Sequence, residues 1–283
     1  MNRKAKVIIW ILAILLLGFV AVYYFILRWD RITYYDGTYD EYESEASFAE
    51  ELASCNVMGV NMHGEVYTYL TDSEYDLDAV SAEDIYYYLD QLDTDPEYKN
   101  IKVVVLEIDS YGGAPVAGEE IANKINEMSV PVIAVIRGAG ASAAYWTASA
   151  ADRIFASKVS DIGSIGVTMS YLDSSSLSKE EGLDWISLSS GKYKDAGNPD
   201  KTLTEEEKKI FQRDLDIIHE EFIKTVAKNR NLPIEKVREL ADGSTMLGEA
   251  ALREGLVDEI GYLKEVKDYI RKTYDIEPDF CWQ

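Results

Sequence analysis

Histidine, the side chain most often used for acid–base chemistry near neutral pH, occurs only twice among the 283 residues, as His63 and His219. A Ser-His-Asp triad would need one of these two in a special position. His219 lies within a predicted amphipathic helix, and we expect it on the helix surface. His63 follows a short predicted strand, and we expect it in a turn. The composition therefore gives little support to histidine-based catalysis or to a metal site.

A glycine-containing stretch, Gly138-Ala139-Gly140-Ala141-Ser142-Ala143, lies between a predicted strand and an Ala-rich helical segment and matches G-x-G-x-x-A. In that context the pattern is typical of a dinucleotide-binding turn, where glycines let a pyrophosphate approach a helix N-terminus. The next predicted strand ends in Lys158 instead of an acid, and Asp161 comes late for a ribose contact. The same glycines equally fit a tight turn that exposes Ser142. A dinucleotide-binding oxidoreductase remains an alternative.

Strand-like and helix-like segments alternate from Cys55 onward, which indicates an α/β core. Runs rich in β-branched residues predict strands, and apolar residues at helical spacing predict the helices between them. The predicted strands cover residues 57–62, 101–109, 132–136, 153–156 and 165–169. The predicted helices cover residues 81–92, the segment with Val116, Ile121, Ile125 and Met128 on its apolar side, and a segment beginning near Ala141.

A long helix is predicted beyond residue 200. Thr204 and Glu207 have the spacing of a capping box, and apolar residues recur at helical spacing until Pro233 ends the run. Two shorter helices are expected over residues 234–240 and 248–254. These helices complete the predicted α/β domain, residues 55–283.

The N-terminal end has the pattern of a membrane anchor. Residues 1–6 are basic, and residues 7–27 form an uncharged, mostly apolar run. At about 1.5 Å per residue this run reaches about 30 Å, the thickness of the hydrocarbon core of a bilayer. It is longer than the apolar region of a cleaved signal peptide and lacks a small-x-small site. We therefore expect a transmembrane helix with a cytoplasmic N-terminus and an extracytoplasmic catalytic domain.

The charge of the chain is strongly and unevenly negative. There are 51 acidic and 28 basic residues, and residues 29–100 hold 19 of the acids against two bases. Binding to the phosphate backbone depends on Lys and Arg, so nucleic acid is excluded as the main partner. Residues 28–54 are largely acidic and Tyr-rich without a clear period, and we interpret them as a stalk or linker.

Two cysteines, Cys55 and Cys281, are too few for a disulfide framework, and their spacing has no metal-site pattern. A single disulfide between them is allowed by the count. We expect instead a buried thiol and a thiol in the C-terminal tail.

Several motifs occur together in a specific order. They are Ser110-Tyr111-Gly112-Gly113, Ala141-Ser142-Ala143-Ala144-Tyr145, Gly163-Ser164-Ile165-Gly166-Val167, Gly191-Lys192-Tyr193-Lys194-Asp195, Ala241-Asp242-Gly243, Gly248-Glu249-Ala250-Ala251 and Gly255-Leu256-Val257-Asp258-Glu259-Ile260-Gly261. In order and rough spacing they resemble the bacterial signal peptide peptidase A family, peptidase family S49, in its short single-copy form. The resemblance covers about residues 55–265 and implies a ClpP/crotonase-like α/β fold.

The resemblance implies a Ser/Lys dyad, which falls on Ser142 and Lys194. A serine hydroxyl is a weak nucleophile until a base takes its proton, and a lysine amine can do this only when burial keeps it neutral. The spacing of the residues does not distinguish Lys192 from Lys194 as the base. The family has Asp directly after its lysine, and Lys194-Asp195 matches that pair, so the resemblance implies Lys194. The family position of Ser164 implies that its hydroxyl orients the lysine amine.

The family also implies a backbone oxyanion hole. Gly113 N–H is the matching donor, within a turn that Gly112 permits, and Ala143 N–H is a second candidate. The chain departs from the family at two places: Ser110-Tyr111 stands where the family often has Asn-Pro, and Ala143-Ala144 stands where it often has glycines. We expect the first departure to alter a substrate pocket, and the second to narrow the space beside the nucleophile.

The implied function is that of a membrane-anchored serine endopeptidase that degrades leftover signal peptides and other apolar peptides. Its pockets would then favour small or aliphatic side chains. The family implies homo-oligomers whose Ser and Lys meet between repeated units, so neighbouring copies would complete each site. No metal, nucleotide or other cofactor is implied. Besides the oxidoreductase, an inactive membrane scaffold and an acyl-CoA enzyme of the crotonase fold remain alternatives.

Overall fold

The computed structural model describes residues 55–71 and 78–283. The predicted basic end, transmembrane anchor and acidic stalk, residues 1–54, lie outside this part. Among the described residues, none of the helices combines the length and the apolar character that crossing a bilayer requires.

The core is a sheet in which all but one pair of neighbouring strands run parallel. The strand order is β10-β1-β4-β5-β6-β9, and the short strand β7 also pairs with β5 and, in antiparallel fashion, with β8. The bounds are β1 Val57–His63, β4 Val103–Ser110, β5 Val132–Ala141, β6 Arg153–Ala156, β7 Asp161–Gly163, β8 Thr245–Leu247, β9 Glu259–Ile260 and β10 Phe280–Trp282. A separate parallel pair joins β2 Glu65–Tyr67 to β3 Ala79–Ser81.

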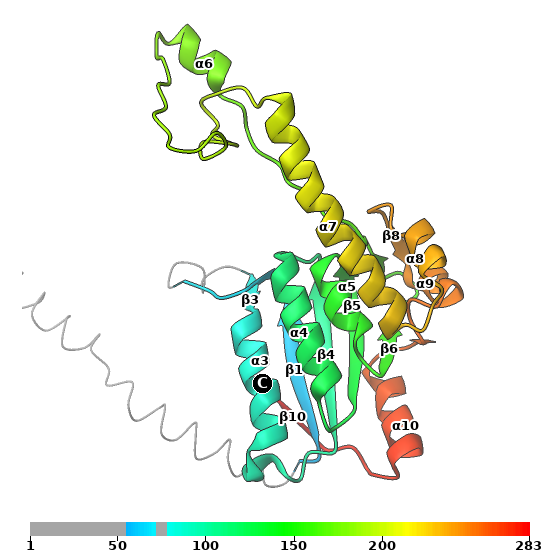
Figure 1. Cartoon of the computed structure of the whole chain (residues 1–283). Coiled ribbons are helices and arrows are strands. Elements are labelled where there is room, and N and C mark those ends of the chain that lie inside the picture. Colours follow the sequence, from blue (N-terminus) through cyan, green and yellow to red (C-terminus); the bar gives the residue numbers. More distant parts are fainter. Residues whose placement is uncertain (1–54, 72–77) are drawn as a thin grey trace, which may run out of the picture. The chain divides into compact units, whose positions relative to one another are not determined.

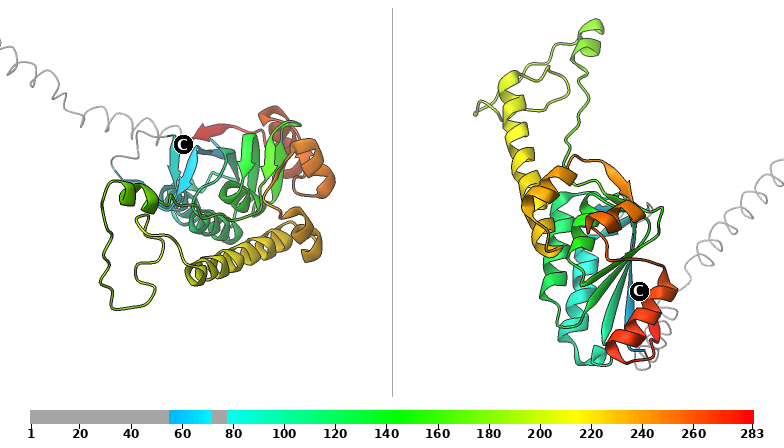
Figure 2. Two further views of the ribbon diagram at one scale, coloured as in Figure 1. Left: turned by 90° about the horizontal axis from the view of Figure 1, so that it is seen from above. Right: turned by 90° about the vertical axis from the view of Figure 1, so that its right-hand side faces the viewer.

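Helices cover both faces of this sheet (Figures 1 and 2). Their bounds are α3 Ala82–Thr94, the 3-10 turn Pro96–Tyr98, α4 Pro115–Glu127, α5 Ala143–Ser149, α6 Ser175–Glu180, α7 Glu205–Asn229, α8 Ile234–Leu240, α9 Gly248–Glu254 and α10 Leu263–Tyr274. Strand β4 is buried almost throughout because it has helices on each side, which is typical of parallel sheets. The predicted α/β class is confirmed.

Each face has its own apolar contacts. On one face, Val266 and Ile270 of α10 pack against β1, β4, β5 and β6. On the other face, α5 is buried along its whole length beside α4 and α7. Gly118 of α4 allows the close approach to α5, because a Cβ there would lie 2.6 Å from the Ala143 carbonyl oxygen. The helix that begins at Ala143 is therefore held on several sides.

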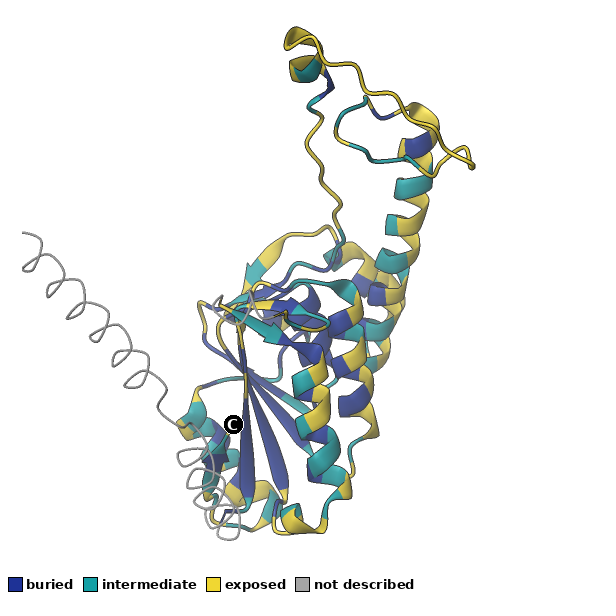
Figure 3. Ribbon diagram, turned by 90° about the vertical axis from the view of Figure 1, so that its left-hand side faces the viewer, coloured by how far each residue is buried: buried dark blue, intermediate teal, exposed yellow. Residues whose placement is uncertain are grey.

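Residues 169–215 form a separate feature, which we call the arm. It contains α6, the loop around Lys194 and the first part of α7, and it lies away from the sheet (Figure 1). Its buried residues are Ser175, Leu203 and Glu207. We call the remaining described residues the body, and Figure 3 shows that nearly all of the buried residues belong to it.

The expectation of two free thiols is wrong, because Cys55 and Cys281 form a disulfide with a Cα–Cα distance of 5.9 Å. Strand β10 brings them together by pairing with β1 in parallel, with Val57 opposite Phe280. The pairing joins positions that are 226 residues apart. Sequence spacing carries no information about such a contact.

The expected strand over residues 165–169 is also wrong. The strand in this region is β7, which ends at Gly163. Gly163 and Ser164 have φ angles of 97° and 48°, and two successive residues in this region turn the chain out of the extended conformation. Residues 166–168 line a pocket instead, as described below.

Candidate active site

Ser142 stands between the end of β5 and the first residue of α5. Its φ and ψ are 53° and −127°, a conformation that a residue with a Cβ rarely adopts. The Ser142 N–H donates to the Gly163 carbonyl oxygen at 2.8 Å, and the Ser142 carbonyl accepts from Trp146 N–H at 2.9 Å. These bonds hold the residue in its strained conformation. Such strain often accompanies functional sites.

Gly112 and Gly113 lie directly against this turn. A Cβ on Gly112 would lie 2.7 Å from the Ser142 Cβ, and the φ of Gly112 is 103°. Gly113 forms a bridge with Val66, whose carbonyl oxygen would lie 2.0 Å from a Cβ on Gly113. Only glycine fits at either position. Neither the Gly113 N–H nor the Ala143 N–H donates a hydrogen bond to another described residue. Both donors are therefore available to a ligand at Ser142.

Ser164 faces the same place from the end of β7. Its N–H donates to the Ser244 carbonyl at 3.0 Å, and its hydroxyl donates to the Gly243 carbonyl at 2.9 Å. With its proton directed at Gly243, the Ser164 oxygen can still accept a hydrogen bond. An amine is a donor that this arrangement fits.

A pocket of about 350 Å³ joins these residues. It is lined by Ser142, Ser164, Gly113 and Pro115, by residues 166–168 and 241–243, and by His219. His219 was expected on the helix surface, and this expectation is wrong. His219 lies three and four residues before Phe222 and Ile223, which are buried, so it shares their face of α7. That spacing could have identified it from the sequence.

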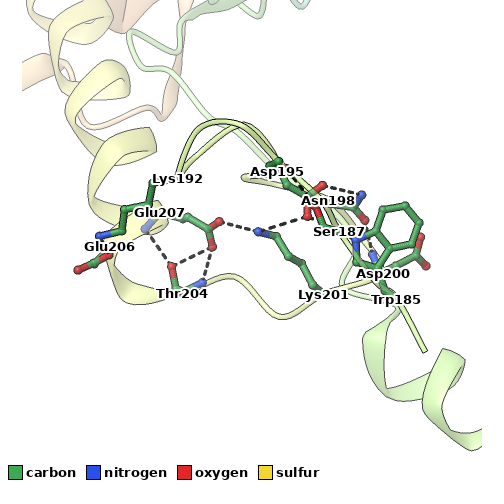
Figure 4. A network of polar contacts seen from close by, with 11 residues as sticks. Trp185, Ser187, Lys192, Asp195, Asn198, Asp200, Lys201, Thr204, Glu206 and Glu207 are labelled. Atoms are coloured by element: carbon green, nitrogen blue, oxygen red, sulfur yellow. Dashed lines mark hydrogen bonds and ion pairs between the residues drawn. The ribbon is translucent and has the colours of Figure 1, made fainter. Parts of the chain in front are cut away.

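Lys194 does not line this pocket in the single chain. It lies in the arm with an exposed side chain that forms no ion pair with another described residue. Lys192, the alternative candidate, pairs instead with Glu206 at 2.5 Å, and this hydrogen bond raises the pKa of Lys192, which disfavours the neutral amine (Figure 4). The structure thus brings Ser142, Ser164, Gly112, Gly113 and Ala143 together and leaves Lys194 apart from them.

The residues around Lys194 are held by polar contacts. Lys201 Nζ lies 2.7 Å from Glu207 Oε1 and 3.7 Å from Asp195 Oδ2 (Figure 4). Glu207 also accepts from the Thr204 N–H and hydroxyl, which completes the predicted capping box at the start of α7. The hydrogen bond from Lys201, followed by those from Thr204, lowers the pKa of Glu207 to about 2.

The two glycines of the G-x-G-x-x-A segment do not form the turn before α5, which is made at Ser142. Strand β5 continues through Ala141, so both glycines lie within the strand. A Cβ on Gly138 would lie 2.7 Å from Asp109 Oδ1, and one on Gly140 would lie 2.7 Å from the Ile136 Cδ1. Packing against neighbouring side chains explains these glycines without a nucleotide.

A second hollow, of about 710 Å³, is also lined by Gly113. It includes Tyr111, whose hydroxyl donates to Asp161 Oδ2 at 3.1 Å, and His63, whose Nε2 is 3.4 Å from Glu107 Oε1. Tyr111 therefore ties the loop before the two glycines to β7. Ser110 and Tyr111, where the chain departs from the family, both line this hollow.

Comparison with known proteins shows which family the chain resembles. The model of peptidase family S49 matches residues 124–277. A protein of Methanocaldococcus jannaschii named "Putative protease" is 38% identical over 180 residues, which are 63% of this chain and 58% of that protein. A protein of Enterococcus faecium named "Putative signal peptide peptidase SppA" is 36% identical over 188 residues, 65% of this chain and 55% of that protein.

The chain thus spans somewhat more than half the length of these two relatives. Among solved structures, a mutant of ClpP1 from Listeria monocytogenes is similar with a TM-score of 0.48 and 17% identity, over 77% of this chain and 95% of that one. The family model covers more than half of the sequence, and its range includes Ser142, Ser164 and Lys194. The chain belongs to peptidase family S49.

Proposed function

We propose that this protein is a membrane-anchored serine endopeptidase with Ser142 as nucleophile and Lys194 as general base. The observation that carries the proposal is the conformation of Ser142, held at a φ of 53° at the edge of a pocket that Ser164 and Gly113 also line. Membership of a peptidase family supports the same reading. An acyl-CoA enzyme would use the two glycines alone and would have no need of a lysine amine.

Lys194 comes from a neighbouring copy of the chain in this proposal. In the single chain it is exposed and outside the pocket, whereas Ser142, Ser164 and Gly113 line the pocket together. The arm that carries it also exposes large apolar side chains, with Leu172 and Ile186 each 80% exposed and Leu188 97% exposed. Exposed apolar patches mark interaction surfaces. Association through the arm would bury these side chains and remove Lys194 from water.

The reaction follows from these positions. Neutral Lys194 Nζ, held by the Ser164 oxygen, takes the proton from the Ser142 hydroxyl while Ser142 Oγ bonds to the carbonyl carbon of the peptide. The oxyanion accepts hydrogen bonds from the Gly113 and Ala143 N–H groups. The C–N bond then breaks, and the lysine returns the proton to the leaving amine. The Lys194 amine then takes a proton from a water molecule, which attacks the carbonyl carbon of the acyl-enzyme ester. The ester C–O bond breaks, and the proton passes to Ser142 Oγ, which restores the free serine.

The proposed substrates are signal peptides left in the membrane and other apolar peptides. The apolar run over residues 7–27 would hold the enzyme at the bilayer, where such peptides are found. The name of the Enterococcus relative supports this substrate class. The Cys55–Cys281 disulfide supports an extracytoplasmic catalytic domain, because disulfides persist in oxidising compartments.

The test is hydrolysis of a fluorogenic apolar peptide by the full chain in detergent. Ser142→Ala and Lys194→Ala should each reduce kcat by about 10³-fold or more, because the two groups act as a unit. Lys192→Ala is the matched control and should retain activity, because Lys192 pairs with Glu206. Equal activity in all four proteins would contradict the proposal. Loss of activity in Lys192→Ala alone would contradict the assignment of Lys194.

Mixing the two inactive variants tests whether the site lies between copies. If Ser142 and Lys194 come from adjacent chains, co-assembled Ser142→Ala and Lys194→Ala should recover about a quarter of the wild-type activity, the share of random contacts that keep both groups. If both groups come from one chain, no mixture has an intact site and the activity stays at zero.

A further inference from the structure

His219 lines the Ser142 pocket, and the proposed dyad leaves its imidazole unused. It lies on α7, one turn before Phe222, which stacks on Trp146 of α5 at 4.4 Å between ring centroids. Trp146 in turn belongs to the helix that begins beside Ser142. Helix α7, which carries the imidazole, therefore packs against the helix that follows the nucleophile, and His219 lines the pocket together with residues 241–243.

The imidazole has an unmet hydrogen-bonding requirement. His219 Nε2 is buried and has no hydrogen-bond partner among the described residues. Arg230 Nε is in the same state, but Arg230 has another nitrogen 2.7 Å from Asp258. A buried polar atom without a partner is unfavourable, so a native structure normally satisfies it with protein, water or ligand. The terminal torsion of histidine is soft, so either ring edge can turn toward the pocket.

The other polar groups of the pocket restrict what can fill it. The Asp242 carboxylate accepts hydrogen bonds from the Ser244 hydroxyl and N–H. These two hydrogen bonds lower the pKa of Asp242 and favour its negative form. An acidic side chain would therefore be repelled. A purely apolar side chain would leave His219 Nε2 without a partner. A neutral side chain with a hydroxyl or amide group suits both the volume and the donors and acceptors.

We propose that His219 is a specificity-determining residue that hydrogen-bonds to a neutral polar side chain of the substrate next to the scissile bond. This inference rests on the proposed peptidase function. It changes the expectation of apolar pockets, because the pocket beside Ser142 then favours Thr over Val and Asn over Leu, pairs that match in shape and differ in polarity. A site that hydrogen-bonds its substrate discriminates strongly against an analogue that lacks the group.

The experiment measures kcat/KM of the full chain in detergent for peptides that carry Thr or Val, and Asn or Leu, at each position flanking the cleaved bond. We expect the wild type to prefer the polar member at one position by about tenfold or more. His219→Leu should reduce this ratio to within about twofold, and His219→Gln, which keeps an N–H and an acceptor, should restore part of it. Lys224→Leu is the matched control on α7, because Lys224 is exposed, and should leave the ratio unchanged.

Three results would overturn the inference. The first is a polar preference that survives in His219→Leu. The second is loss of hydrolysis of all peptides in that variant, which would make His219 part of the proton transfer. The third is a change of the oligomer mass in His219→Leu, which would make it an interface residue.

A binding measurement separates this inference from the proposed function. Ser142→Ala, with and without His219→Leu, is titrated with the same labelled peptides, and the ratio of Kd values replaces the ratio of kcat/KM. If the wild type hydrolyses nothing, the peptidase proposal fails. A preference in Kd that disappears with His219→Leu would still support the pocket assignment, and a ratio near one in both proteins would overturn it.

Discussion

The body and the arm hold their functional residues in opposite ways. Ser142 and the two glycines of the body are enclosed by strands and helices whose core side chains are almost fully buried. The arm places Lys194 on a loop that is organised by hydrogen bonds and ion pairs, with its large apolar side chains exposed (Figures 3 and 4). The proposed nucleophile is therefore held in position within one chain, whereas the position of the proposed base depends on what the arm contacts.

The body and the arm should also differ in how cooperatively they unfold. Apolar burial and strand pairing connect the strands of the main sheet to one another, so the body should unfold as one unit. The arm contributes few buried residues, and regions of this kind open at low free energy. Changes to packing in the body should thus alter catalysis or global stability, and comparable changes to packing in the arm should act locally.

Among the changes that test this difference between the body and the arm, we expect the largest effect at Gly112. Gly112→Ala should reduce kcat by about 10²–10³-fold, because its Cβ would lie 2.7 Å from the Ser142 Cβ and 2.8 Å from the Ala143 N, which displaces the proposed oxyanion donors. The measurement is kcat of the folded variant, checked by circular dichroism.

Gly182 in the arm provides the control for Gly112. Its φ is also positive, at 76°, but a Cβ there would meet nothing within 4 Å. Gly182→Ala should therefore carry only local backbone strain, about 1–2 kcal/mol, and keep most of the activity. Equal loss of activity in both variants would mean that the body and the arm do not differ in the way described.

An intermediate effect is expected from the disulfide, which belongs to the body alone. Replacing Cys55 and Cys281 together by Ala should lower the free energy of unfolding by about 2–4 kcal/mol, because the bridge closes a very long loop in the unfolded chain. Thermal unfolding with and without a reductant measures the effect, and reductant should not change the variant. In the control, the wild type is unfolded, reduced and refolded in reductant before its Tm is measured. The prediction is contradicted if this Tm equals that of the untreated wild type.

The smallest and most local effect is a pH response of the arm. Glu207 has a pKa of about 2 in the folded protein against an ordinary value of 4.5, because Lys201 and Thr204 donate hydrogen bonds to its carboxylate. Since the folded pKa is the lower one, this stabilisation is present above about pH 4.5 and is lost as the pH falls toward 2. Amide-exchange protection of residues 201–207 should decrease over that range.

Glu207→Gln is the reference for this measurement. It should show reduced protection of residues 201–207 already at neutral pH, while the amides of β4 and β5 stay protected in both proteins. If acid exposes β4 before residues 201–207, the arm is not the less stable region.

Much of the fold follows from local pattern. The predicted strands at residues 57–62 and 132–136 correspond to β1 and β5, and the helices predicted over 234–240 and 248–254 match α8 and α9. The capping box at Thr204 is present. Apolar periodicity and end signals suffice for these elements because each is defined by residues close together in the chain.

Other features depend on contacts that the pattern does not contain. Strand β10 has three residues and exists because it pairs with β1, more than 200 positions away. The expected strand at 165–169 is absent because of the backbone turn at Gly163 and Ser164. Helix α10 has the apolar positions Val266 and Ile270 at helical spacing, so a closer reading of the sequence could have found it.

The sequence by itself determined the α/β class, the family and the identity of the candidate nucleophile, because ordered motifs and residue periodicity are local properties of the chain. Only the tertiary structure decided which of these residues meet. It placed Gly112, Gly113 and Ser164 around Ser142, brought His219 into their pocket, paired Cys55 with Cys281, and left Lys194 exposed on the arm. Proximity between distant residues is set by strand order and helix packing, and a linear pattern does not encode those directly.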